Sequence, residues 1–444
     1  MNVLVVGGGA REHALCATVA RSKNATLFSV MSNLNPGIEQ LAKEFLVTKE
    51  TNVDEVTQFA VSRKVDLVLV GPEAPLEVGI VDSLQKAGIA SCAPSKAAAR
   101  IETNKEWMRN LLQRHQIPGQ LAYEVVTSAQ DAKAFIDRFH GEVAIKPIGL
   151  TGGKGVRVAG DHFTGTQEAL TYISEVIEKK IGGAAKVLLE EKAIGEEFTL
   201  QAFSDGEHLA PLPAVQDHKR LLPDDKGPNT GGMGSYSCID GLLPFLREGE
   251  YKEGLHILEL IVQALKKEGH PYIGPIYGQF MLTHSDVKLI EVNARFGDPE
   301  AMNVLPLLQT DFLEVCSAML SQTLEKKPLS LAKKSTVCKY VVPEGYGVES
   351  MSGYPITVDE PAIRSLGDLV FYASVNKKNH DIVTGTSRAV AVVGIADTID
   401  SAEKQCEAGL SFIHGEHLFV RHDIGTRPLL ERRSTHMQKI RGKP

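Results

Sequence analysis

The chain begins with a strand, a glycine-rich turn and a helix: Val3-Leu4-Val5-Val6-Gly7-Gly8-Gly9-Ala10-Arg11-Glu12-His13. The apolar run predicts a buried strand of a parallel sheet, and glycines at a strand-to-helix turn let backbone N–H groups bind an anion. The dinucleotide fingerprint is incomplete, because Glu12 stands where its third glycine belongs. A smaller phosphorylated ligand is therefore favoured over NAD.

The following segments repeat this pattern. Strands are predicted over 26–31 and 65–70, and helices over 12–21 and 53–63. Such alternation is typical of βαβ units in a doubly wound parallel sheet. The turns Asn35-Pro36-Gly37 and Gly71-Pro72-Glu73 come near or after predicted strand ends, which is the edge where these sheets bind ligands.

Composition restricts the class of protein. The chain has 444 residues, with Lys+Arg 48, Asp+Glu 55 and a formal net charge of -7. This length predicts roughly three domains, the acidic balance disfavours nucleic acid, and no apolar run reaches the roughly 20 residues of a membrane helix. The cysteines include no CxxC pair. We expect a cytoplasmic multidomain enzyme, with α/β and α+β parts and reduced, mostly buried cysteines, that binds neither nucleic acid nor a membrane.

The order of predicted elements divides the chain. We expect a Rossmann-like domain over 1–103, a small α+β module over 121–192, a central domain over 104–120 and 193–325, a small α+β domain over 326–426, and a solvated basic tail over 427–444.

A second glycine-rich segment, Gly149-Leu150-Thr151-Gly152-Gly153-Lys154-Gly155, lies between two predicted strands. It is not a Walker A loop, since Gly155 replaces the Ser/Thr after the lysine and a strand follows instead of a helix. A β-hairpin flap could fold N–H groups and Lys154 over a triphosphate, while Lys146 from the preceding strand adds a second positive charge. The alternative is a solvated hairpin.

A strand predicted over 287–293 carries Glu291 and Asn293, followed by Arg295. The period of two places the three side chains on one face. Oxygen ligands suit Mg²⁺, and an adjacent arginine can offset charge as a phosphoryl group transfers. The alternative is a structural salt bridge on an edge strand.

Residues 216–220 (Gln-Asp-His-Lys-Arg) and 227–234 crowd polar residues and glycines beyond what a connector needs. His218 alone is interpreted as an ordinary loop histidine.

Together these segments resemble one family, the glycinamide ribonucleotide synthetases (phosphoribosylamine–glycine ligases) of the ATP-grasp superfamily. The similarity extends over residues 1 to about 425 and is carried by residues 8–15, 71–76, 152–155, 216–220, 227–234 and 291–300.

The resemblance implies an ATP-grasp fold in which 121–192 is the lid and the central domain is catalytic. It also implies that ATP, glycine and 5-phosphoribosylamine give glycinamide ribonucleotide, ADP and phosphate through glycyl phosphate. The implied cofactors are ATP and Mg²⁺ or Mn²⁺, and the protein would be a monomer or a small homo-oligomer.

The resemblance also implies roles for residues. The implied catalytic groups are Asp217, Lys219, Asn229 and Arg295. The implied ATP contacts are Lys105, Lys146, Gly152, Gly153, Lys154, Gly155, Glu190, Glu191 and Glu197. The implied substrate contacts are Gly9, Arg11, Glu12, Asn35, Pro36, Gly37, Glu73, Asp217, Thr230 and Asp298. The implied metal ligands are Glu291 and Asn293, with Gln279 as a third candidate.

The chain departs from the family pattern in three places. Residues 149–153 read Gly-Leu-Thr-Gly-Gly where Gly-Leu-Ala-Ala-Gly is common, which keeps the needed glycines. The hinge, usually two acids, an aromatic and Leu, reads Glu190-Glu191-Lys192-Ala193. Tyr277-Gly278-Gln279 replaces Tyr-Ala-Gly, near where other ATP-grasp enzymes place their first metal carboxylate.

Two other functions stay open. Another ATP-grasp ligase, such as the purine-pathway carboxylase that phosphorylates bicarbonate, would share the fold, although residues 217–234 argue against it. An NAD-linked oxidoreductase would explain only the first segment.

Overall fold

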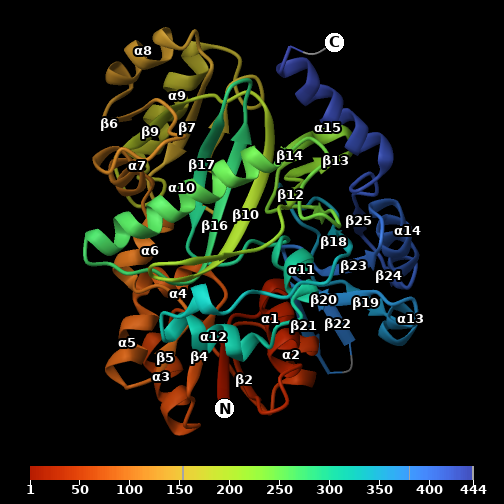
Figure 1. Ribbon diagram of the computed structural model, residues 1–444. Coiled ribbons are helices and arrows are strands. Elements are labelled where there is room, and N and C mark those ends of the chain that lie inside the picture. The colour runs from red at the N-terminus through yellow and green to blue at the C-terminus, as the bar shows by residue number, and fades with distance from the viewer. Residues whose placement is uncertain (153–154, 380, 443–444) are drawn as a thin grey trace.

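The first strand lies at the centre of a five-stranded parallel sheet with the order β3-β2-β1-β4-β5 in this computed structural model, which describes residues 1–152, 155–379 and 381–442. Its side chains alternate between two cores: Leu4 and Val6 pack with α3 and α5, and Val3 and Val5 pack with α1. Helices therefore cover both faces (Figure 1), which confirms the doubly wound sheet. The elements of this part are β1 (Asn2–Val6), α1 (Ala10–Ala20), β2 (Thr26–Met31), α2 (Pro36–Leu41), β3 (Glu44–Val47), α3 (Val53–Ser62), β4 (Leu67–Val70), α4 (Glu73–Val78), α5 (Ile80–Lys86), β5 (Ala90–Ser91) and α6 (Lys96–Thr103).

The small module over 121–192, which the resemblance implies is a lid, is an antiparallel sheet with the order β6-β9-β7-β8. Phe135, Ile145 and Tyr172 belong to a hydrophobic core that is separate from the cores of the other parts. Figure 1 shows this module at the upper left, with α8 and α9 on its outer side. Gly153 and Lys154, both expected in the flap between β7 and β8, lie outside the described residues. The lid elements are β6 (Tyr123–Val126), α8 (Ala129–Arg138), β7 (Val143–Pro147), β8 (Arg157–Val158), α9 (Thr166–Glu178) and β9 (Val187–Glu191).

The central sheet has the order β11-β10-β16-β17. One face is apolar because Phe198 and Phe280 pack in a common core with Leu258 of the long helix α10. The elements here are α7 (Lys105–Arg114), β10 (Glu196–Asp205), β11 (Leu209–Pro211), α10 (Glu248–Lys267), β16 (Ile273–Leu282), β17 (Val287–Asn293), α11 (Ala301–Val304), α12 (Phe312–Leu320) and the 3-10 turns η2 (Leu305–Leu307) and η3 (Leu324–Lys326).

The C-terminal sheet has the order β12-β15-β18-β23-β20, and β25 also pairs with β18. Two of its strands, β12 (Gln216–Asp217) and β15 (Gly234–Ser237), come from the middle of the chain and enclose a hairpin of β13 (Arg220–Leu222) and β14 (Lys226–Asn229) with the turn η1 (Pro223–Asp225) at its tip. Because β12 and β15 pair in the C-terminal sheet, the hairpin that connects them lies between the central and C-terminal parts. The remaining elements are β18 (Ser335–Pro343), β19 (Pro355–Val358), α13 (Glu360–Ser365), β20 (Leu369–Tyr372), β21 (Val375–Lys378), β22 (Asp381–Thr384), β23 (Val390–Ala396), α14 (Ile399–Leu410), β24 (Ile413–Gly415) and β25 (Leu418–Val420).

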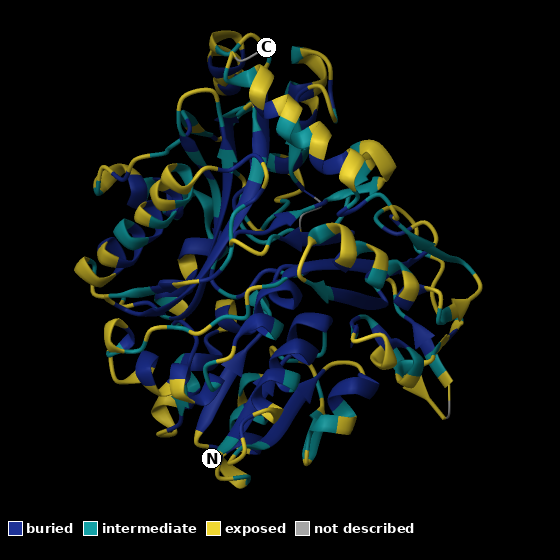
Figure 2. Cartoon of the chain, turned by 45° about the vertical axis from the view of Figure 1, so that its right-hand side comes forward, coloured by how far each residue is buried: buried dark blue, intermediate teal, exposed yellow. Residues whose placement is uncertain are grey.

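The final segment is a helix, α15 (Arg427–Ile440). The expectation of a solvated tail over 427–444 is wrong, because Leu429, Leu430 and Met437 are buried among the charged residues at helical spacing. Figure 2 shows buried residues concentrated in the sheets and exposed residues on the outward turns of the helices.

The cysteines agree with the expectation, since all six are free and only Cys238 is not fully buried. Within the described ranges, no helix combines the length and apolar character needed to cross a membrane.

Candidate active site

The second face of the central sheet is polar. Gln279 lies opposite both Glu291 of β17 and Thr199 of β10, and Tyr277 lies opposite Asn293. The register of the pairing between β16 and β17 shifts between Gln279 and Phe280. Leu289 and Glu291, which would share a face in a regular strand, therefore face opposite sides, with Leu289 towards the core. The sheet therefore presents carboxylate and amide groups on the face away from α10.

Three lysines surround Glu291. Burial opposes ionisation of Glu291, but Lys219, Lys146 and Lys105 outweigh it and lower its pKa. Each lysine comes from a different part of the fold, namely the hairpin segment, the lid strand β7 and the start of α7. Such a cluster of positive charge beside a carboxylate suits a polyphosphate with a bound cation.

The lid lysine pairs with Glu190 of β9, and Glu190 also pairs with Arg109 of α7. Lys146 Nζ lies 2.6 Å from Glu190 Oε2, and Arg109 Nε lies 2.6 Å from Glu190 Oε1. Burial opposes ionisation of Glu190, but Arg109 and Lys146 lower its pKa to about 2. The Glu190 carboxylate thus holds Lys146, and Glu191 accepts a hydrogen bond from the Ala122 N–H at 2.8 Å.

The metal-ligand candidates fit a hard cation. Gln279 Nε2 donates to Glu197 Oε2 at 2.8 Å, whereas Gln279 Oε1 is buried and has no hydrogen-bond partner in residues 1–152, 155–379 and 381–442. Glu291, Asn293 and this carbonyl are oxygen donors on neighbouring strands, and oxygen is what Mg²⁺ and Mn²⁺ prefer. Among the residues that the structure describes, no group of three or more His, Cys, Asp and Glu side chains could hold a metal.

Arg295 differs from the expectation that it shares the strand face. Strand β17 ends at Asn293, and the guanidinium reaches the N-terminal domain, with Nη2 2.9 Å from Glu102 Oε1 and Nε 3.3 Å from Glu73 Oε2. Burial raises the pKa of Glu102 to about 7 despite the opposing Arg295 charge. Arg295 still lies near enough to Glu291 to contribute to its low pKa.

The glycine-rich hairpin segment adds a mixed cluster of charges. Burial and the Glu300 carboxylate raise the pKa of Asp217 well above its usual value. Lys219 Nζ lies 3.4 Å from Glu197 Oε2, and Thr230 donates to the Lys219 carbonyl at 2.8 Å. The backbone of Gly232 has φ +109, and a Cβ there would stand 2.7 Å from Asp217 Oδ1. Only glycine therefore leaves room for that carboxylate.

Asp298 lies on the other side of this cluster. It accepts a hydrogen bond from Tyr340 Oη at 2.6 Å and pairs with Arg388 Nη1 at 3.2 Å. Arg388 also donates to the Gly231 carbonyl at 2.6 Å. Asn229 ends β14 opposite Arg220, whereas Asp217 ends β12 and Lys219 directly precedes β13.

The N-terminal turns meet at one edge of the parallel sheet. Glu12 accepts from the Gly9 N–H at 2.7 Å and from Arg11 Nε at 2.6 Å. Its side chain lies against Gly71, where a Cβ would stand 2.0 Å from Glu12 Oε1. Glu12 occupies the position of the third glycine in the dinucleotide fingerprint. Its side chain fills the space between the turns at Gly9 and Gly71.

The Asn35 side chain has both polar atoms occupied by the backbone. It donates to the Gly8 carbonyl at 2.9 Å and accepts from the Gly37 N–H at 3.0 Å. Arg11 also donates to the Phe296 carbonyl at 3.1 Å. These contacts place the first turn beside the turn at Pro36 and beside the segment that carries Arg295.

Four charged residues of this region had no predicted role: Arg109, Glu102, Glu300 and Arg388. Glu300 lies in the 291–300 segment and accepts from Tyr277 Oη at 3.0 Å, so the motif itself could have identified it. The other three contact the site only through the tertiary fold. His218 also differs from an ordinary loop histidine, because it is buried and neither ring nitrogen has a hydrogen-bond partner among the described residues.

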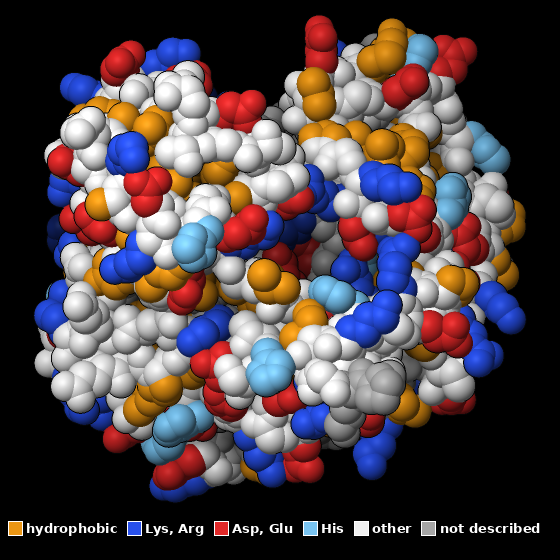
Figure 3. All heavy atoms as spheres, turned by 90° about the horizontal axis from the view of Figure 1, so that it is seen from above, with side chains coloured by type: hydrophobic (Ala, Val, Ile, Leu, Met, Phe, Trp, Pro, Cys, Tyr) orange, Lys and Arg blue, Asp and Glu red, His pale blue; other side chains and the backbone are white. Residues whose placement is uncertain are grey.

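Figure 3 views the molecule from above and shows Lys, Arg, Asp and Glu side chains gathered in the hollow between the two sides of the molecule. The lid, the hairpin segment and the polar sheet face thus supply charges of both signs, as a site for phosphorylated substrates requires.

Family models and relatives match the folded parts of the chain. Family models described as the N, ATP-grasp (A) and C domains of phosphoribosylglycinamide synthetase match residues 1–102, 103–301 and 336–427. A phosphoribosylamine–glycine ligase of Methanothermobacter thermautotrophicus is 50% identical over 99% of this chain and 100% of its own length. The same-named protein of Methanocaldococcus jannaschii is 47% identical over 99% of this chain and 100% of its own length.

Solved structures are similar in fold. The phosphoribosylamine–glycine ligase of Thermotoga maritima has a TM-score of 0.81 at 24% identity, covering 96% of this chain and 100% of that chain. The biotin carboxylase of Campylobacter jejuni has a TM-score of 0.70 at 14% identity, covering 97% of this chain and 95% of that chain. Because the three family models follow one another along the chain in the order of its folded parts, and relatives match over their whole length, the chain belongs to the phosphoribosylglycinamide synthetase family.

Proposed function

We propose that this protein ligates glycine to 5-phosphoribosylamine at the expense of ATP, giving glycinamide ribonucleotide, ADP and phosphate, a step of purine biosynthesis. The observation that carries the proposal is the convergence of Lys105, Lys146 and Lys219 on Glu291, near Asp217 at the end of β12. The names of the full-length relatives support the same reaction.

The ATP phosphates would bind between the lid and the polar face of the central sheet. Lys105 and Lys146 offer positive charge there, and Lys105 Nζ already lies 3.1 Å from the Gly149 carbonyl at the start of the flap. Glu291, Asn293 and Gln279 would hold a divalent cation. When bound, Mg²⁺ or Mn²⁺ neutralises phosphate charge and orients the γ-phosphoryl group.

The first step requires a carboxylate close to that phosphoryl group. An oxygen of glycine would form a bond to the γ-phosphorus while the bond to the bridging oxygen breaks, and ADP would leave with that electron pair. Lys219 and Arg295 are the groups we assign to the charge that spreads over the transferring phosphoryl. Asp217 would hold the glycine ammonium.

In the second step, the amine nitrogen of phosphoribosylamine would attack the acyl carbon and lose a proton, and phosphate would leave with the electrons of the C–O bond. The phosphate of phosphoribosylamine would bind at the N-terminal turns of Gly9, Arg11 and Pro36. Arg11 and Arg295 connect these turns to the central site through Phe296 and Glu73, so the amine would face the acyl phosphate.

Another ATP-grasp reaction, carboxylation through carboxyphosphate, is the alternative. The biotin carboxylase likeness concerns the fold alone at 14% identity, and the Asp217 cluster offers an ammonium site that bicarbonate does not need. The cytoplasmic location and the oligomeric state stay predictions.

The test is ADP release by the purified protein with ATP, Mg²⁺ and glycine, with and without freshly prepared phosphoribosylamine. We expect ADP release to depend on both substrates, with a product of the mass of glycinamide ribonucleotide. Replacing glycine by bicarbonate is the control. Equal or faster ADP release with bicarbonate, without the glycine product, would exclude the proposed reaction.

A further inference from the structure

The C-terminal helix α15 contacts two elements of the active site through one side chain. Arg433 Nη2 lies 2.6 Å from Asp225 Oδ2 at the tip of the β13–β14 hairpin, and Arg433 Nη1 lies 3.4 Å from Glu196 Oε2 at the start of β10. This helix follows the segment matched by the family models, which ends at residue 427. A single guanidinium therefore links the hairpin to the central sheet from the outside.

A second link joins the same two elements from the inside. Glu196 and Glu197 are consecutive in β10, so their side chains point to opposite faces. Glu196 faces α15, whereas Glu197 faces the site, where it lies 3.4 Å from Lys219 Nζ. Lys219 directly precedes β13. The hairpin is thus connected to β10 by Arg433 on one face and by Lys219 on the other.

The Glu196 end of the outer link is buried and has further polar neighbours, whereas Arg433 and Asp225 are partly exposed. Glu196 is 2% exposed and also contacts His436 Nδ1 at 2.6 Å and Gln216 Nε2 at 3.3 Å. Gln216 in turn accepts from Tyr236 Oη at 2.6 Å. Because Glu196 has little access to water, removing its cation would leave a buried carboxylate under-compensated.

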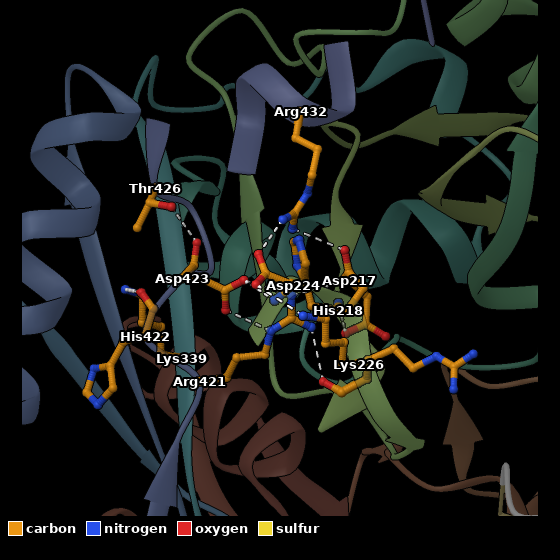
Figure 4. A network of polar contacts seen from close by, with 12 residues as sticks. Asp217, His218, Asp224, Lys226, Lys339, Arg421, His422, Asp423, Thr426 and Arg432 are labelled. Atoms are coloured by element: carbon orange, nitrogen blue, oxygen red, sulfur yellow. Dashed lines mark hydrogen bonds and ion pairs between the residues drawn. The ribbon is translucent and has the colours of Figure 1, made fainter. Parts of the chain in front are cut away.

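The hairpin tip depends on positive charge from the C-terminal part. Arg421 is fully buried, pairs with Asp225 at 2.8 Å and donates to the Arg220 carbonyl at 3.0 Å. Figure 4 shows Arg432 extending from α15 towards Asp224, with Arg421 beside Asp423 and with Asp217 and His218 close by. Burial opposes ionisation of Asp225, but Arg433 and its other charged neighbours lower its pKa to about 2.

We propose that Arg433 is a positioning residue for the ligation: by tying Asp225 to Glu196, it fixes the hairpin against β10 and holds the Lys219 ammonium in the site beside Glu291. The proposal rests on the function proposed above, which assigns Lys219 to the transferring phosphoryl group. A displacement of about 1 Å at a reacting group can lower a rate by about 10²-fold, so a contact outside the site can affect turnover.

The test begins with Arg433→Ala and Arg427→Ala. Arg427 is the matched control, because it is an exposed arginine of the same helix whose partner, Glu431, lies within that helix. We expect Arg433→Ala to lower kcat by about 10- to 100-fold while the KM for ATP stays within about threefold. Arg427→Ala should behave as the unchanged protein. Equal kcat for Arg433→Ala and the unchanged protein would overturn the proposal.

The second arm asks whether Arg433 acts through Lys219. In a Lys219→Gln background, measured by single turnover, Arg433→Ala should lower the rate by less than about threefold, because residues that act together are non-additive. A full, additive loss in that background would show that Arg433 acts by another route and would overturn the proposal.

Glu196→Gln provides an independent variant if Arg433→Ala lowers stability. It keeps the side-chain shape and removes the carboxylate charge that Arg433 pairs with, and we expect the same selective loss of kcat at a Tm close to that of the unchanged protein. Normal kcat in Glu196→Gln would contradict the positioning role. Failure of the proposed function is distinguishable, because the unchanged protein would then form no glycinamide ribonucleotide.

Discussion

At the scale of single residues, the site is a balance of buried charges. Glu291 offsets three lysines that would otherwise repel one another in a partly buried space, and those lysines in turn keep Glu291 ionised. A neutral side chain of the same shape would leave Glu190 and Glu197 as the remaining acidic partners of Lys146 and Lys219, and it would remove a metal-ligand candidate.

We therefore predict that Glu291→Gln lowers kcat for ADP release by about 10²- to 10³-fold with the fold intact. Steady-state kinetics and circular dichroism measure the two properties. Lys288→Gln is the control, because Lys288 lies on the same strand and pairs with Asp286 near the surface. Ordinary turnover by Glu291→Gln would remove this residue from the catalytic assignment.

Asp368 is a buried acid outside the site. It is 1% exposed, and neither carboxylate oxygen has a hydrogen-bond partner within the part of the chain that the structure describes. Burial raises its pKa from 3.8 to about 7. The pKa of Asp368 is higher in the folded protein than in the unfolded protein, so the folded protein binds this proton more tightly. The resulting contribution to the free energy of unfolding is complete below about pH 4 and is lost as the pH rises to about 7.

We predict that Asp368→Asn flattens this part of the pH dependence. Between pH 4 and pH 7 the Tm of the unchanged protein should fall relative to that of Asp368→Asn, and above this range the variant should be the more stable protein. Thermal unfolding followed by circular dichroism measures both, with Asp381→Asn at an exposed position as the control. Parallel pH curves for the unchanged protein and Asp368→Asn would contradict the assignment.

At the scale of elements, the flap between β7 and β8 is attached by side chains from two helices. Lys105 of α7 donates to the Gly149 carbonyl at 3.1 Å, and Tyr172 of α9 donates to the Gly155 carbonyl at 2.7 Å. These two attachments lie on either side of the residues expected to close over nucleotide. Such lids close on substrate binding and can limit turnover.

We predict that hydrogen exchange in peptides spanning residues 149–157 slows when a non-hydrolysable ATP analogue is added. Backbone N–H groups that bind phosphate oxygens exchange less readily with water. Helix α8, on the outer side of the same lid, should show no comparable change. If 149–157 exchange at the same rate with and without the analogue, this segment does not bind the triphosphate.

At the scale of the whole molecule, the site lies where three parts of the chain meet. Arg295 follows the central sheet but pairs with Glu73 and Glu102 of the N-terminal domain, whereas Asp217 belongs to a strand of the C-terminal sheet. The two small substrates are therefore expected to be bound by different domains and to meet between them.

We predict that Arg11→Ala mainly raises the KM for phosphoribosylamine and that Asp217→Asn mainly impairs the use of glycine. Contacts made equally in the ground and transition states change KM more than kcat. Arg21→Ala is the control for Arg11, because Arg21 follows the same helix and also reaches the central domain, at the Leu305 carbonyl. If Arg11→Ala raises only the KM for glycine, the two substrate sites have been exchanged.

The amino-acid sequence by itself determined the elements whose signals are local. Strand β17 has the predicted bounds of 287–293, and the parallel sheet follows from apolar runs that alternate with helices. Glycine turns and period-two faces depend on neighbouring residues, so they can be read without the fold. The sequence segments around Lys219 and Glu291 predicted site residues for the same reason, because their patterns are also local.

Only the tertiary structure decided which charges meet. Arg295 bonds to carboxylates about two hundred residues away in sequence, Arg388 reaches Asp298 from the C-terminal part, and α15 packs Met437 where a solvated tail was expected. No local sequence pattern predicts which residue a long charged side chain will pair with. Its partner is selected by the packing of whole domains, because a buried ion pair forms only where the fold excludes water from both groups.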